Sequence, residues 1–68
     1  MEWDRIRSNW AHYGALAQAR WSEMTQREVE LIDGQREVLA GHISMVYGIS
    51  RDAATIELEL WQRQLGEL

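Results

Sequence analysis

Histidines are the side chains best suited to metal binding or to proton transfer near neutral pH, and the chain has two, His12 and His42. Neither has a second histidine or an acidic residue three or four positions away, the spacing that places two ligands on one face of a helix. The chain has no cysteine, so disulfides and thiolate metal sites are excluded. We therefore expect surface or partly packed histidines, and we predict no metal site and no cofactor.

Serines and carboxylates are the remaining candidates for catalysis. No serine lies in the pattern of a nucleophile elbow, and Ser50 has the position of a helix cap. The best-placed acidic side chains lie in the middle of the chain: Glu28, Glu30, Asp33 and Glu37. A small-molecule pocket usually needs about 300 Å³ or more, and we expect little room for one in so small a protein. We interpret these carboxylates as a solvated face and a helix cap, and we predict no enzymatic activity.

Four tryptophans are the other group that could bind a ligand: Trp3, Trp10, Trp21 and Trp61. Stacking sites for nucleic-acid bases combine aromatic rings with a positively charged groove. This chain has no lysine, and its seven arginines are outnumbered by eleven acidic residues, which gives a net charge of −4. Phosphate backbones are bound mainly through clustered positive charge. We therefore predict that the tryptophans pack in the core, and we expect no nucleic-acid partner.

The length of 68 residues predicts a single domain over residues 1–68, near the lower limit for independent folding. A core of this size seldom supplies more than about 3–5 kcal/mol of net stability without a disulfide or metal. No apolar stretch approaches the roughly 18 residues of a membrane span, and no basic segment precedes an apolar run as in a secretion signal. We expect a cytoplasmic protein without a membrane span.

Helices are the elements that must position these side chains. The chain has no proline and five glycines, and its apolar residues recur at steps of three and four. We predict an all-α domain of four helices, over about residues 4–22, 26–33, 35–47 and 51–66. Four short helices with tight corners form two helical hairpins, which we expect to cross at a steep angle.

The corners between the predicted helices carry local signals. Thr25 followed three residues later by Glu28 is the pattern of a capping box. Gly34 either ends the second helix or bends it into the third; we favour a break, and one long kinked helix is the alternative. Gly48 is placed to end the third helix in the left-handed conformation, and Ser50 is placed to cap the fourth.

One set of residues spans the corners and the core: Ile32-Asp33-Gly34-Gln35-Arg36-Glu37, Leu39, Gly41 and Tyr47-Gly48-Ile49-Ser50, with Trp3, Ile6, Trp10, Trp21, Thr25, Ala54 and Trp61 further out. With these residues at these spacings, the chain resembles the CsbD-like family of small bacterial proteins associated with general stress responses. The resemblance covers roughly residues 3–61. It implies a compact bundle of two orthogonally packed hairpins and a stress context. It implies no site residues, because the molecular activity of the family is undefined.

A second set of apolar residues departs from the family pattern, which usually has polar or charged residues at these positions: Leu31, Val38, Met45, Ile56 and Leu60. A domain of this size buries roughly 60% of its unfolded surface, so two apolar faces per helix cannot both be internal. Contiguous exposed apolar surface usually marks a partner site. We predict that these residues form a self-association or partner-binding surface; scattered surface residues without a role are the alternative.

The resemblance implies a bacterial general stress-response protein, and the second apolar set indicates that it acts through protein–protein contacts; we expect it to be non-enzymatic. The partner is either another copy of the chain, in a homo-oligomer, or an unidentified protein. The alternative is an amphipathic protein that binds membrane surfaces under stress. Such helices usually carry a basic polar face, and here the polar faces are acidic and lack lysine.

Overall fold

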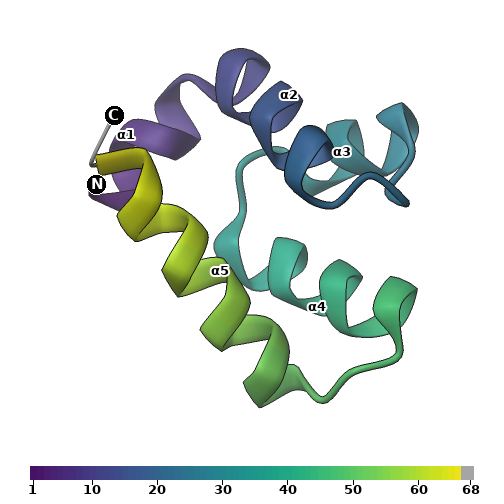
Figure 1. Cartoon of the computed structure of the whole chain (residues 1–68). Coiled ribbons are helices and arrows are strands. Elements are labelled where there is room, and N and C mark those ends of the chain that lie inside the picture. Colours follow the sequence, from purple (N-terminus) through teal and green to yellow (C-terminus); the bar gives the residue numbers. More distant parts are fainter. Residues whose placement is uncertain (67–68) are drawn as a thin grey trace.

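Five α-helices make up the computed structural model, which describes residues 1–66. In chain order they are α1 (Trp3–Ser8), α2 (Trp10–Arg20), α3 (Gln26–Ile32), α4 (Arg36–Tyr47) and α5 (Arg51–Gly66). Figure 1 shows α4 and α5 as a hairpin, with α2 and α3 across the molecule from it and α1 beside the carboxyl-terminal end of α5. The predicted all-helical class is confirmed for the described residues.

The prediction of one helix over residues 4–22 is wrong, because the chain leaves the helical conformation at Asn9, where φ is −126° and ψ is 49°. The carbonyl of Asn9 accepts hydrogen bonds from the N–H groups of His12 and Tyr13, both at 3.1 Å, and so begins α2. Ser8 and Asn9 both have low helix propensity. The break gives five helices instead of four, and the two orthogonal hairpins that the resemblance implies stay a prediction.

The bend at Asn9 lets two indoles reach different parts of the chain. The Nε1–H group of Trp3 donates to the carbonyl of Gly34, and that of Trp10 donates to the carbonyl of Val29, each at 2.9 Å. A buried indole N–H needs an acceptor. The first bond attaches α1 to the turn between α3 and α4, and the second attaches α2 to α3 itself.

Helices α3 and α4 are separate elements, as favoured from the sequence. Asp33 and Gly34 both have left-handed conformations, with φ of 50° and 73°. A Cβ atom on Gly34 would lie 3.2 Å from the backbone Cα and carbonyl oxygen of Arg7. The break thus combines a left-handed turn with a close approach of α1, and only glycine suits both.

The predicted caps are confirmed. Thr25 Oγ1 accepts from the N–H of Glu28 and Glu28 Oε1 accepts from the N–H of Thr25, both at 3.1 Å. Gly48 ends α4 with φ of 63°. Ser50 Oγ then accepts from the N–H of Ala53 at 3.1 Å, which starts α5.

Every helix contributes buried apolar side chains to one core: Ile6, Ala17, Trp21, Met24, Val29, Ile32, Leu39, Ala40, Ile43, Ala54, Leu58, Trp61 and Leu65. Trp61 of α5 lies between the other aromatic groups, with ring centroids 5.3 Å from Trp21 and 6.3 Å from Trp3 in edge-on packing. The described residues include no buried polar or charged side chain. The interior is therefore apolar and is joined across α1, α2 and α5 by indole contacts.

Candidate functional site

The two histidines lie on different helices. His12 is exposed on α2, where its ring packs edge-on against Tyr13 with 4.9 Å between centroids. His42 is half-buried on α4, with Nδ1 3.0 Å from the carbonyl oxygen of Val38. Among residues 1–66, no group of three histidine or acidic side chains is placed to hold a metal ion.

The acidic residues singled out from the sequence have separate surroundings. Glu28 belongs to the capping box, and Glu37 accepts from the guanidinium of Arg51 at 2.8 Å. Asp33 lies in the left-handed turn after α3, and Glu30 is exposed on α3. In the described part of the chain, no hydrogen bond joins a histidine to a serine or to a carboxylate. The arrangement offers no paired nucleophile and base.

The tryptophans contribute to the interior. Trp21 and Trp61 are buried, and Trp3 and Trp10 are half-buried against the core. The Nε1–H of Trp21 donates to a carboxylate oxygen of Glu57 at 3.2 Å. Trp10 also borders a hollow of about 260 Å³ between α2 and α3. The indole N–H groups of Trp3, Trp10 and Trp21 thus have different acceptors, and the four rings do not surround a common space for a ligand.

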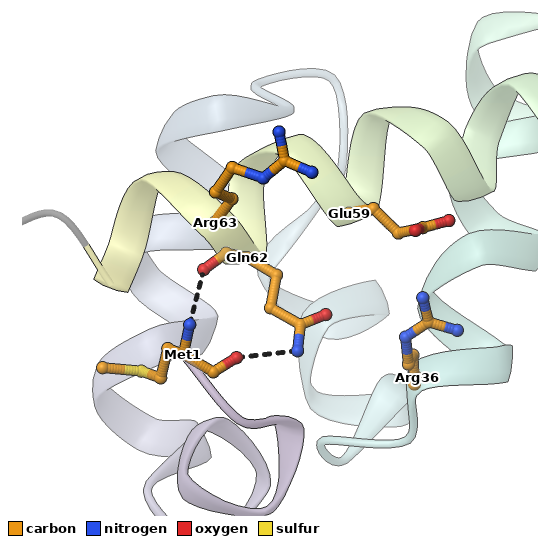
Figure 2. Close-up of a pocket in the computed structure, with 5 residues that line it drawn as sticks. All are labelled: Met1, Arg36, Glu59, Gln62 and Arg63. Carbon is orange, nitrogen blue, oxygen red and sulfur yellow. Dashed lines mark hydrogen bonds between the residues drawn. The ribbon is translucent and has the colours of Figure 1, made fainter.

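A surface hollow of about 410 Å³ lies between the first residue, the start of α4 and the outer part of α5. Figure 2 shows the side chains that line it: Met1, Arg36, Glu59, Gln62 and Arg63. We expected little room for a pocket of about 300 Å³. This hollow has a larger volume, but it is an open depression of the surface and does not enclose a ligand.

Two large apolar side chains are exposed on the outer face of α5, and we call them the α5 ridge: Ile56 and Leu60. Their exposed fractions are 59% and 49%. They are four residues apart, so they adjoin on one face of the helix. Leu58 and Trp61 are buried on the opposite side of α5. The structure therefore brings these two predicted surface residues together.

The other residues of the predicted partner surface lie on α3 and α4. Leu31 is 64% exposed near the end of α3, and Met45 is 70% exposed on α4. Val38 differs, because it is half-buried and packs against the core. Leu31 and Met45 are exposed positions on helices other than the one that carries the α5 ridge.

Carboxylates flank the α5 ridge. At 100° per residue, Asp52 and Glu59 lie along one side of the ridge and Glu57 lies along the other. Glu57 is half-buried, and its carboxylate accepts a hydrogen bond from the Trp21 indole.

Arg63 is three residues after Leu60, so this basic side chain lies on the same face at the carboxyl-terminal end of the ridge. The positions of the acidic residues beside Ile56 and Leu60 could have been predicted from the sequence by the same helical periodicity. The α5 ridge is an apolar strip with an exposed acidic border on one side, formed by Asp52 and Glu59. None of the five described helices is long and apolar enough to cross a membrane.

Three relatives illustrate what the chain is similar to. A UPF0337 protein of Pectobacterium atrosepticum is 31% identical over 62 residues, which cover 91% of this chain and 90% of the relative. One of Xanthomonas axonopodis pv. citri is 31% identical over 65 residues, covering 96% and 94%. The UPF0337 protein YjbJ of Escherichia coli is 28% identical over 64 residues, covering 94% and 93%.

The names of these relatives state no biochemical activity, so the comparison identifies kinship and no site residues. No family model and no solved structure matches the chain. The curated relatives match over nearly their full length and over nearly the full length of this chain. The chain therefore belongs to the UPF0337 family, the CsbD-like family that its sequence resembles.

Proposed function

We propose that this protein is a non-enzymatic component of the bacterial general stress response that acts by binding another protein through the α5 ridge. The observation that carries the proposal is the exposure of Ile56 and Leu60, at 59% and 49%, on a helix whose opposite face is fully engaged in the core. The stress context comes from the family resemblance. The cytoplasm is the proposed place of action.

The proposed contact on the partner is an amphipathic helix with a basic flank. An apolar strip is a docking surface for the apolar face of a helix, because the contact removes both from water. The exposed carboxylates of Asp52 and Glu59 border one side of the α5 ridge, and they attract lysine or arginine on the adjoining side of such a helix. The acidic border thus favours a partner with positive charge beside its apolar face.

Self-association through the α5 ridge is the second form of the proposal. A twofold contact places the same surface of both copies face to face. Such a contact would bring the carboxylates of Asp52 and Glu59 from both copies to the same interface, and like charges in an interface oppose association. We therefore expect a basic partner to bind more tightly than a second copy near neutral pH.

Binding to membrane surfaces is the competing function. Amphipathic helices that bind anionic bilayers use basic residues around their apolar face. The exposed side chains beside the α5 ridge are the two carboxylates of Asp52 and Glu59 and the single basic residue Arg63. The acidic border favours a basic protein over an anionic lipid surface.

A peptide-binding experiment tests the proposal. A helical peptide of leucine and lysine, with its leucines on one face, is titrated into the protein with calorimetric detection. We expect saturable binding that weakens at least tenfold in Ile56→Glu/Leu60→Lys, because loss of about 1.4 kcal/mol corresponds to a factor of ten. This double variant keeps the net charge, so a change in affinity reports the apolar contact.

Met45→Gln is the matched control, since Met45 is an exposed apolar residue on a different helix. It should bind the peptide as the parent does. Equal affinity of the double variant and the parent would contradict the proposal. Retention of the parent on anionic vesicles, without peptide binding, would favour the membrane function instead.

A further inference from the structure

The bend at Asn9 separates two helices whose apolar residues follow one continuous pattern. Four side chains recur at steps of three, four and three, the spacing of one helix face: Trp3, Ile6, Trp10 and Tyr13. The bend itself is formed by one exposed residue, Asn9, with φ of −126° and ψ of 49°. The side-chain pattern thus fits a straight helix through this point, and the backbone of a single residue departs from it.

The start of α2 would gain hydrogen bonds in a straight helix. The first N–H groups of a helix have no acceptor within that helix, and the side chain of Asn9 does not cap α2. In one helix over residues 3–20, the N–H groups of Trp10 and Ala11 would donate to the carbonyls four residues earlier, those of Ile6 and Arg7. A straight form therefore satisfies backbone groups for which the bent form provides no cap.

Helix α1 needs a surface that covers its apolar side. Ile6 is completely buried, and Trp3 donates to the carbonyl of Gly34 and packs its ring against Trp61. The helix has six residues, and a helix of this length is not stable alone in water. These contacts join α1 to residues far along the chain, so a second copy of the chain offers the same covering surface. As part of one helix with α2, α1 would also stay helical while it moves between the two surfaces.

We propose that Asn9 is a hinge and that α1 exchanges between two copies of this chain. In the exchanged dimer, residues 3–20 of each copy form one helix, and α1 of each copy occupies the α1 position of the other. The core contacts of α1 are kept, because both copies supply the same residues. Association costs the freedom of two separate molecules, so the dimer forms at high protein concentration. The exchange does not involve Ile56 or Leu60 and is independent of partner binding by the α5 ridge.

Refolding from urea at millimolar protein concentration, followed by analytical ultracentrifugation, measures the exchange. We expect a dimer in the parent. Asn9→Ala should raise the dimerisation constant about tenfold, because alanine favours the straight helix in both copies. Asn9→Gly should lower it about threefold, because glycine disfavours that helix. His12→Ala is the matched control, since His12 is exposed and lies within α2 in both forms, and it should leave the constant unchanged.

Isotope-filtered nuclear Overhauser measurements on an equal mixture of labelled and unlabelled chains, refolded together, distinguish exchange from contact between surfaces. We expect a contact between the Trp3 ring of one copy and the Trp61 ring of the other. A dimer in which this contact lies only within each copy would overturn the proposal and would favour association through the α5 ridge. The absence of a dimer in Asn9→Ala at millimolar concentration would also overturn it, as would an equal rise of the dimerisation constant in His12→Ala.

Discussion

The hairpin of α4 and α5 and the segment from α1 to α3 are held in shape by different kinds of interaction. The ends of α4 and α5 at their shared corner depend on neighbours in the chain, with Gly48 in the left-handed conformation and Ser50 as a cap. The path of α1 and α2 depends on distant partners, because Trp3 and Trp10 donate to carbonyls 31 and 19 residues away. Local chemistry thus shapes the α4–α5 corner, and tertiary contacts shape the path of α1 and α2.

The largest expected effect comes from Trp61, where the two halves meet. Its ring packs against Trp3 and Trp21, so Trp61→Ala removes the contact that joins α5 to α1 and α2. We expect a loss of about 3–5 kcal/mol in the free energy of unfolding, comparable with the whole stability of a domain this small. Urea denaturation followed by circular dichroism measures it. Leu60→Ala, on the exposed side of α5, should change the value by about 0.5 kcal/mol or less.

Gly34 and Gly48 both have left-handed conformations, but only Gly34 lies close to another helix. Comparing alanine variants at the two positions therefore separates the cost of backbone strain from the cost of a tertiary clash. Gly34→Ala adds a Cβ atom 3.2 Å from the backbone of Arg7, whereas a Cβ atom on Gly48 would meet nothing within 4 Å. We expect Gly48→Ala to cost about 1 kcal/mol for its conformation alone, and Gly34→Ala to cost about 2–3 kcal/mol. Thermal and urea unfolding of both variants provide the measurement. Equal losses would show that α1 does not approach Gly34 closely.

The indole hydrogen bonds are expected to have the next effect in size. Trp3→Phe and Trp10→Phe keep an aromatic ring but leave the carbonyls of Gly34 and Val29 without their donors. We expect each to lower the free energy of unfolding by about 1–2 kcal/mol. Tyr13→Phe is the control, because its hydroxyl makes no hydrogen bond within the described residues. If Tyr13→Phe lowered the free energy of unfolding as much as the two indole variants, the losses in those variants could not be assigned to the indole hydrogen bonds.

The smallest effects should come from the caps. Thr25→Ala and Ser50→Ala each remove a side-chain acceptor from a helix start. We expect each to cost about 1 kcal/mol. Ser22→Ala, at an exposed position outside the helices, should cost less than either. If Thr25→Ala lowered the free energy of unfolding and Ser50→Ala did not, the claim that local chemistry shapes the α4–α5 corner would be wrong.

Prediction from the sequence succeeded where neighbouring residues determine the structure. The capping box at Thr25, the break at Gly34 and the corner from Gly48 to Ser50 all depend on interactions within a few residues. The break at Asn9 was missed, because the apolar periodicity continues across it. The indole bonds that accompany it involve carbonyls that no local pattern indicates.

The same distinction applies to the candidate sites. The exposure of Ile56 and Leu60 followed from helical periodicity, since the buried face of α5 was predictable. The partial burial of Val38 did not follow from it. The hollow at Arg36 and Arg63 could not be foreseen either, because it forms only where the first residue, the start of α4 and the end of α5 meet.

The most direct test of the central claim is to map, by amide chemical shifts, where the leucine–lysine helical peptide binds the labelled protein. The account predicts that the largest shifts lie on the outer face of α5, around Ile56 and Leu60, and that amides around Met45 on α4 change little. Largest shifts on α4, or shifts spread evenly over the acidic surface, would contradict the claim that the outer face of α5 is the docking surface.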